Sequence, residues 1–139
     1  MFFQSNAHYR FELPDEAWKK RLSGPSYLVL RQAQTERPFT SPLLNEHRQG
    51  RFVCAGCAWP LFSSRTKYDS GTGWPSFYQP LSQQSVTTKS DTSLFMVRVE
   101  VMCANCGGHL GHVFDDGPRP TGLRYCMNGV ALNFTPGQA

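Results

Sequence analysis

The sequence predicts a single antiparallel β domain with two short helices at its N-terminal end. Its 139 residues are the size of one domain with one core. The 12 glycines, 10 prolines and 13% aromatic residues are typical of a turn-rich fold rather than a helix bundle. From Arg51 onward, short apolar stretches alternate with turn residues, which is the pattern of successive strands.

Two short helices are expected before the strands. Residues 12–22 place Pro14 at a first helical position, acids directly after it and the basic run Lys19–Arg21 at the end, which suits the helix dipole. A second helix is expected over about 25–33, with Ser23 as its N-cap. Each is too short to be stable alone, so both should pack on the β domain.

Seven strands follow an extended, proline-containing linker at residues 35–42. The clearest is 94–102, where three valines alternate with Arg98 and Glu100, so that one face is apolar and the other polar. The other expected strands are Arg51–Cys54, Pro60–Ser63, Ser85–Lys89, His109–Phe114, Leu123–Met127 and Val130–Phe134.

Charge and hydropathy exclude several classes of protein. The net charge of +4 comes from scattered Lys and Arg with no run longer than Lys19–Arg21, which disfavours nucleic-acid binding. No apolar stretch is long enough for a membrane helix and the start lacks the features of a secretory signal, so a cytoplasmic protein is expected. Residues 1–7 resemble the remnant of an engineered protease site, which leaves 8–139 as the domain.

Four of the five cysteines form two C-x-x-C hooks, Cys54–Cys57 and Cys103–Cys106. Two such hooks supply the four thiolates of a tetrahedral Zn²⁺ site, which would join two distant hairpins. A redox C-x-x-C or a set of buried free thiols would not explain why the hook occurs twice. We therefore expect one closed, structural zinc ion with no role in chemistry, and a reducing compartment.

The fifth cysteine, Cys126, has no partner in this scheme and is predicted to be a nucleophile. The segment His109–Phe114 contains the one close pair of histidines, His109 and His112. Taken alone, a strand cysteine is usually a buried apolar residue and these histidines could equally be structural. Because positions three apart point to opposite faces of a strand, a bend at Gly111 is needed to direct both histidines to one site.

Several motifs together resemble the methionine sulfoxide reductase B family, over about residues 14–134. They are Glu36–Thr40, Lys67–Phe77, both cysteine hooks, His109–Phe114, Asp116–Pro118 and Arg124–Asn128. The resemblance implies two antiparallel sheets with N-terminal helices, and the reduction of methionine R-sulfoxide, chiefly in oxidised proteins, to methionine. Each such repair enzyme acts on one sulfoxide epimer.

The resemblance also implies roles for individual residues. Cys126 would be the catalytic cysteine, with Arg124 or an imidazolium favouring its thiolate, and a histidine would protonate the departing oxygen. The residues that match positions around the sulfoxide oxygen are His109, His112 and Asn128. Those that match the aromatic wall for the substrate methyl group are Trp74 and Phe114, and those that match charged positions at the edge of the site are Arg124 and Asp116.

One departure from the family concerns how Cys126 is recycled. Many members carry a second, resolving cysteine where this chain has Thr72. We therefore expect a one-cysteine enzyme, acting as a monomer, whose sulfenic acid is reduced by thioredoxin or a small thiol. The alternatives are a zinc-stabilised β domain that acts as a non-catalytic binding module, and a reductase whose activity has been lost. A binding module would not require a fifth, reactive thiol.

Overall fold

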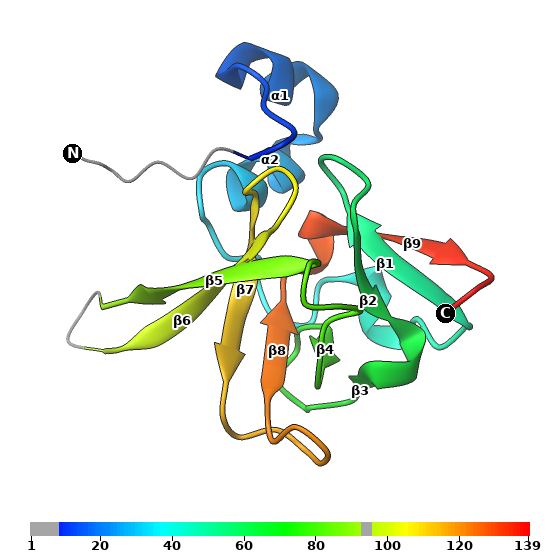
Figure 1. Ribbon diagram of the computed structural model, residues 1–139. Helices are drawn as coiled ribbons and strands as arrows, with labels where there is room; N and C mark the ends of the chain where they lie inside the picture. Colours follow the sequence, from blue (N-terminus) through cyan, green and yellow to red (C-terminus); the bar gives the residue numbers. More distant parts are fainter. Residues whose placement is uncertain (1–8, 93–95) are drawn as a thin grey trace.

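Two antiparallel sheets form most of the structure, and two helices lie at one end of it (Figure 1). The computed structural model describes residues 9–92 and 96–139. The predicted remnant at 1–7, and positions 94 and 95 of the predicted strand 94–102, lie outside the described residues.

The two helices are α1 (Asp15–Arg21) and α2 (Gly24–Leu30). Ser23 caps α2 as predicted, because its side chain accepts a hydrogen bond from the Ser26 amide. Pro14 is the N-cap of α1 rather than its first residue. Trp18 from α1 is buried in the core, which is what holds so short a helix in place.

The strands form a sheet of three, in the order β2-β1-β9, and a sheet of six, in the order β3-β4-β8-β7-β6-β5. The smaller sheet contains β1 (Gly50–Cys54), β2 (Pro60–Ser63) and β9 (Leu132–Pro136). The larger contains β3 (Lys67–Tyr68), β4 (Ser76–Phe77), β5 (Val86–Asp91), β6 (Arg98–Cys103), β7 (His109–Phe114) and β8 (Arg124–Met127). The 3-10 turns of the described residues are η1 (Pro42–Asn45), which precedes β1, η2 (Ser64–Thr66), between β2 and β3, and η4 (Gly129–Ala131), between β8 and β9.

The seven predicted strands are present, and the mainly β prediction is confirmed. Strands β2 and β7 have the predicted ends, and the ends of the other five are shifted. The last begins at Leu132 rather than Val130, because residues 129–131 form η4. The two-residue strands β3 and β4 were not predicted. They lie on either side of a turn that contains glycine and proline, and two residues are too few to show an alternation of apolar and polar side chains.

Aromatic side chains join the two sheets. Phe62 of β2 stacks on Phe77 of β4 with ring centroids 4.3 Å apart, and Phe52 of β1 contacts the same ring at 5.0 Å. All three are fully buried. The inward face of the six-stranded sheet is therefore used for the core, and its opposite face is left for polar side chains.

Strand β7 contains one residue more than its partner β6 at a defined point. Gly111 pairs with Val101 and His109 pairs with Met102, so Leu110 has no opposite residue. This bulge changes the alternation between His109 and His112. The expected change of direction exists, but the extra residue is Leu110, and Gly111 stays in register with both neighbouring strands.

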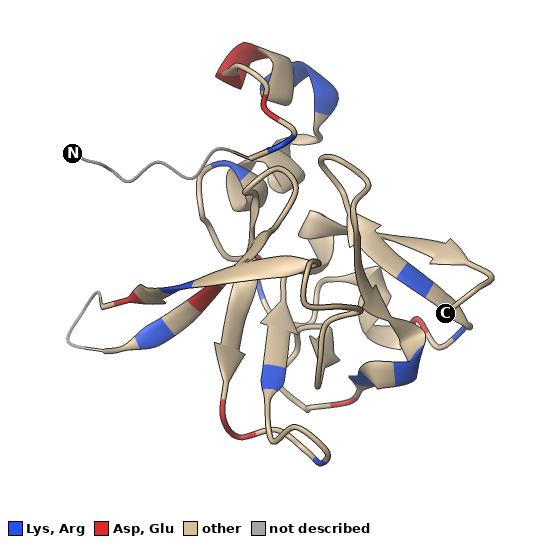
Figure 2. Cartoon of the chain, viewed as in Figure 1, with Lys and Arg blue, Asp and Glu red and all other residues tan. Residues whose placement is uncertain are grey.

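Basic residues occur on α1, on both sheets and in loops, and acidic residues occur on α1, on the six-stranded sheet and in loops, without one continuous basic stripe in the view of Figure 2. Within the described part of the chain, no helix has the length and apolar character required to cross a membrane.

Candidate metal centre and active site

The four hook cysteines come together between the two sheets. Cys54 is the last residue of β1 and Cys57 follows that strand, while Cys103 is the last residue of β6 and Cys106 follows that strand, so each sheet contributes one hook. Their sulfur atoms all lie within 4.8 Å of one another. Cys54 Sγ is 3.8 Å from Cys106 Sγ, and Cys57 Sγ is 3.6 Å from Cys103 Sγ.

This sulfur arrangement fits a tetrahedral metal ion. Four bonds of about 2.3 Å place neighbouring sulfurs about 3.8 Å apart, which the Cys54–Cys106 and Cys57–Cys103 pairs match. The Gly56 amide donates to Cys54 Sγ at 3.3 Å and the Gly108 amide to Cys106 Sγ at 3.4 Å, an environment that favours thiolates over thiols. The donor set therefore fits Zn²⁺ held by four thiolates.

Helices α1 and α2 bring cations to the same two hooks. Arg21 Nε donates to the Gly56 carbonyl at 2.7 Å, and Arg31 Nη1 donates to the Cys106 carbonyl at 3.1 Å. Arg31 also stacks on Trp18, with its guanidinium carbon 4.5 Å from the ring centroid. A site of one Zn²⁺ and four thiolates carries a net charge of −2, so these arginines lie where positive charge is favourable.

A second group of predicted residues surrounds a cavity of about 280 Å³ on the polar face of the six-stranded sheet. The residues that line it are Thr35, Thr72, Trp74, Arg98, Gly111, His112, Phe114, Arg124, Cys126 and Asn128. They come from β6, β7, β8, the residue between β8 and η4, and the two loops that precede η1 and β4.

Strand register places the reactive side chains in one row. Cys126 on β8 is directly opposite Ser76 on β4 and His112 on β7, and His112 is in turn opposite Glu100 on β6. Directly opposite residues of antiparallel strands project from the same face. The close approach of β7 to β8 requires Gly111, since a Cβ there would collide with the Cys126 carbonyl oxygen.

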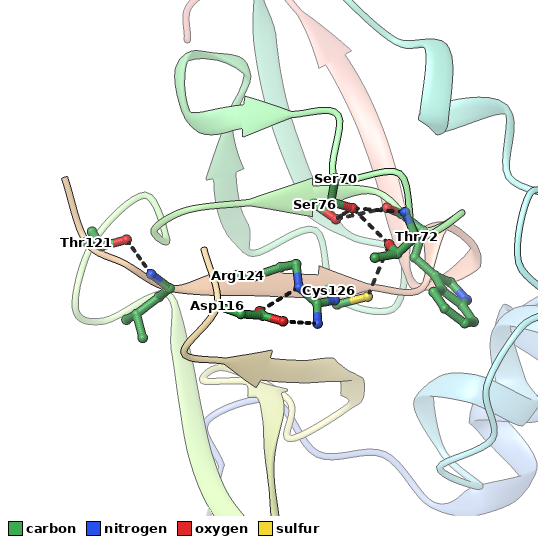
Figure 3. A network of polar contacts seen from close by, with 9 residues as sticks. Ser70, Thr72, Ser76, Asp116, Thr121, Arg124 and Cys126 are labelled. Carbon is green, nitrogen blue, oxygen red and sulfur yellow. Dashed lines mark hydrogen bonds and ion pairs between the residues drawn. The ribbon is translucent and has the colours of Figure 1, made fainter. Parts of the chain in front are cut away.

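Burial dominates the electrostatics of Cys126. It raises the pKa of the thiol, and the Thr72 hydroxyl and the Arg124 guanidinium lower that pKa by less. The predicted influence of Arg124 on the thiol is present, but burial raises the pKa of Cys126 by more than the guanidinium lowers it. Asp116 Oδ1 and Oδ2 accept from Arg124 Nε and Nη2 at 2.8 and 3.1 Å, which balances much of the positive charge (Figure 3).

Arg124 is also fixed by an aromatic contact. Its guanidinium carbon lies 4.4 Å from the centroid of the Phe114 ring, which lines the cavity. Asp116 binds the guanidinium from outside the cavity. It lines a second surface depression, together with Arg124, Tyr68 and Thr72. Arg124 therefore forms a fixed, largely neutralised wall beside Cys126.

The two histidines have different environments. His112 lines the cavity, and its Nε2 lies 3.5 Å from Asp91 Oδ2. His109 lies behind it, with ring centroids 5.6 Å apart and Nε2 3.8 Å from Glu100 Oε1. Burial lowers the pKa of His109, so this imidazole is neutral at pH 7. His112 is thus the histidine with access to a bound ligand.

Asn128 fixes the bulge that orients these histidines. Its Nδ2 and its backbone amide both donate to the Leu110 carbonyl at 2.9 Å, and its Oδ1 accepts from the Glu36 amide at 2.9 Å. Trp74 is held through the same segment, because its Nε1 donates to the Glu36 carbonyl at 3.1 Å. The indole wall and the histidine strand are therefore tied together at Glu36.

Comparison with known proteins identifies the family. A model described as SelR domain matches residues 22–136. A peptide methionine sulfoxide reductase MsrB of Methanosarcina barkeri is 57% identical over 123 residues, which cover 88% of this chain and 87% of the relative. Relatives of the same name from Leptospira interrogans and Bradyrhizobium diazoefficiens are each 54% identical, with 91% and 88% of this chain and 97% and 88% of their own length covered.

The chain belongs to the MsrB family. In this MsrB chain the predicted site residues that line the cavity are Cys126, His112, Asn128, Trp74, Phe114 and Arg124. The other two do not line it: His109 is buried behind His112, and Asp116 reaches the site through Arg124.

Several residues of the MsrB site were not assigned a role from the sequence. Arg98 lines the cavity and is held by Asp91 at 3.2 Å, and Glu100 stands beside His109. The alternation of Arg98 and Glu100 with valines predicted a polar face of this strand, but it did not indicate that this face lines the candidate active site. Glu36 lies in the motif Glu36–Thr40, but no pattern in the neighbouring sequence indicates its hydrogen bonds to distant residues.

Proposed function

We propose that this chain reduces methionine R-sulfoxide, chiefly in oxidised proteins, with Cys126 as the nucleophile. Its family makes it a peptide-methionine (R)-S-oxide reductase. The observation that carries the proposal is the direct opposition of Cys126 and His112 on neighbouring strands, both at the wall of one cavity. A nucleophile and an acid so placed can act on the same sulfoxide group.

In the proposed reaction, the Cys126 thiolate attacks the sulfoxide sulfur while the sulfoxide oxygen takes up a proton. The attack forms a bond between Cys126 Sγ and the substrate sulfur. The protonated oxygen then passes to Cys126 as a hydroxyl group, the S–O bond and the new S–S bond break, and methionine leaves as the thioether. Cys126 is oxidised to a sulfenic acid as the substrate is reduced. Trp74 and Phe114 offer apolar faces for the substrate methyl group, since both line the cavity.

His112 is the proposed proton donor. It lines the cavity, and its Nε2 lies 3.5 Å from Asp91 Oδ2. His109 supports it from behind, and Asn128 holds the bulge between them. We propose that Arg124 limits the cavity on the side of Phe114, and that Asp116 keeps it there.

An external thiol is proposed to restore Cys126. The chain has five cysteines, and four of them are gathered in the metal cluster. Thr72 stands beside Cys126, with its Oγ1 4.0 Å from the sulfur, and cannot form a disulfide (Figure 3). Two thiol equivalents, from a small thiol or from thioredoxin, would convert the sulfenic acid to thiol, with a disulfide and water as products.

Zn²⁺ is the proposed occupant of the four-cysteine cluster. Four thiolates leave no open position on the ion, so its role is to stabilise the fold. Reduced thiols in the cluster and at Cys126 fit a reducing compartment, and the cytoplasm is our proposal.

The test is single-turnover reduction of each methionine sulfoxide epimer, without added reductant, by the wild type and by Cys126→Ser. About one equivalent of methionine is expected from the R epimer and none from the variant, with Cys126 recovered as a sulfenic acid. An intramolecular disulfide at Cys126 would exclude the one-cysteine route. Equal inertness of both proteins toward both epimers, with zinc retained, would favour the binding-module alternative.

A further inference from the structure

We infer that Thr72 is a positioning residue for Cys126. Its hydroxyl ends a chain of hydroxyl groups through Ser70 and Ser76, which takes one orientation beside the thiol and the reverse beside the thiolate. The inference rests on the proposed role of Cys126 as the nucleophile.

The chain of hydroxyl groups is continuous from the nucleophile to Ser76 (Figure 3), and Ser76 extends it to a backbone carbonyl. Thr72 Oγ1 lies 4.0 Å from Cys126 Sγ and 2.8 Å from Ser70 Oγ. Ser70 Oγ lies 2.7 Å from Ser76 Oγ, and Ser76 Oγ lies 3.0 Å from the Trp74 carbonyl oxygen. Ser76 is buried and stands directly opposite Cys126 in the β4–β8 pairing.

Each hydroxyl has one proton, so the direction of the whole chain is set at its inner end. The Trp74 carbonyl can only accept, so Ser76 donates to it. Ser70 then donates to Ser76 and Thr72 donates to Ser70. The Thr72 oxygen can therefore only accept from the sulfur, and this arrangement matches a protonated Cys126.

A thiolate requires the opposite direction, because it can only accept. Thr72 then turns its proton to Cys126, Ser70 donates to Thr72, and Ser76 donates to Ser70. No proton moves along the chain: three hydroxyls rotate, and the thiol proton leaves to solvent. One neutral hydrogen bond to the Trp74 carbonyl is exchanged for a charge-assisted bond to sulfur, which is about twice as strong. The chain thus opposes part of the effect of burial on Cys126.

Other charged and titratable groups also face Cys126. They are Arg124 on its own strand, with Asp116 behind it, His112 on β7, Arg98 on β6 and Tyr68 on β3. Substitutions at Thr72 and Ser76 leave all of them in place. A difference between such variants therefore reports on the hydroxyl chain.

The test is the pH dependence of Cys126 alkylation by iodoacetamide in the zinc-loaded protein, quantified at this residue by mass spectrometry. Thr72→Val, which keeps the shape and removes the hydroxyl, is expected to raise the pKa of Cys126 and to slow alkylation at pH 7 about threefold to tenfold. Thr72→Ser should behave as the wild type, and Thr72→Ala should repeat the effect of valine.

Ser76→Ala gives the decisive comparison, because it should shift alkylation in the opposite direction. Without Ser76 the thiol arrangement loses two hydrogen bonds and the thiolate arrangement loses one, so the pKa of Cys126 should fall and alkylation at pH 7 should become faster. Equal profiles for Thr72→Val and wild type, or slower alkylation in both variants, would overturn the inference. The assay uses no sulfoxide, so its result is separate from that of the Cys126→Ser reduction test.

Discussion

At the scale of single residues, the Cys126 thiol is harder to ionise in the folded protein than in water. Burial raises its pKa, and the compensating charge of Arg124 is weakened by its own partner, Asp116. Reactivity toward a sulfoxide therefore depends on a thiolate that is the minor form at neutral pH.

We predict that the rate constant for alkylation of Cys126 by iodoacetamide rises with pH from neutral into the alkaline range. Because the pKa of Cys126 is raised, each pH unit below that pKa increases the thiolate fraction about tenfold. Mass spectrometry at this residue tests this, and Asp116→Asn, which leaves the charge of Arg124 unbalanced, should move the rise to lower pH. A rate constant that does not change with pH from neutrality upward would contradict the prediction.

A second residue-level prediction concerns the proton donor. His112→Asn should lower the single-turnover rate constant about 100-fold, because general acid catalysis supplies effects of that order. His47→Asn is the matched control, since His47 is exposed and does not line the cavity. Protein folding and zinc content should be unchanged in both. A His112→Asn variant with the wild-type rate constant would rule out this imidazole as the donor.

The sequence made the identity of these residues predictable, but not their electrostatics. Cys126, His112 and Trp74 lie in motifs particular enough to be recognised. The direction of the Cys126 pKa depends on how far strands β4, β7 and β8 bury the sulfur, and this is not a local property. The contact of Asp91 with His112 could not be predicted for the same reason, because Asp91 lies on a different strand, β5.

At the scale of elements, the segment before η1 fixes the site from one side. The Glu36 carboxylate accepts from the Gly129 amide at 2.8 Å and from the Val130 amide at 3.0 Å, at the start of η4. Its backbone binds Trp74 and Asn128. One residue of an irregular segment thus connects the aromatic wall, the bulge and the turn that follows Cys126.

We predict that Glu36→Gln lowers the free energy of unfolding by about 1.5–3 kcal/mol, the range for hydrogen bonds to a charged group. Urea denaturation measures the change. Glu16→Gln is the control, because Glu16 is exposed on α1 and its ion pair with Lys19 spans 3.7 Å, so a change of less than about 0.5 kcal/mol is expected. The prediction fails if the two variants are equally stable.

Strands with a strong alternation of apolar and polar residues could be predicted from the sequence. Features that arise from the pairing of one strand with another could not. Strand β6 has regular valine alternation, and β7 has the predicted ends. The bulge at Leu110 arises from register against β6, which the β7 sequence does not specify. Strands β3 and β4 likewise exist because β8 offers a free edge to β4.

At the scale of the whole molecule, three sets of contacts join the two sheets and the helices. Phe52, Phe62 and Phe77, the phenylalanine cluster, pack the two sheets against each other. The cysteine hooks bring together the turns that follow β1 and β6. Arg21 and Arg31 then attach the helices to those turns. The spacing of the hooks predicted that distant hairpins would meet, but the order of the strands required the structure.

The last prediction is that removal of zinc unfolds the domain. Zinc binding to four-ligand sites contributes about 10–16 kcal/mol in small peptides, and domains of this size are stable by about 5–15 kcal/mol. Chelation of zinc, or the substitution Cys103→Ser, should therefore abolish the cooperative thermal unfolding transition, which circular dichroism measures. Both should also remove the one bound equivalent of zinc, which atomic absorption measures. Cys126→Ser is the matched control: it removes a thiol outside the cluster and should keep both. If the metal-free protein melts at the wild-type temperature, the sheets are held by the phenylalanine cluster alone, and the hooks have a different purpose.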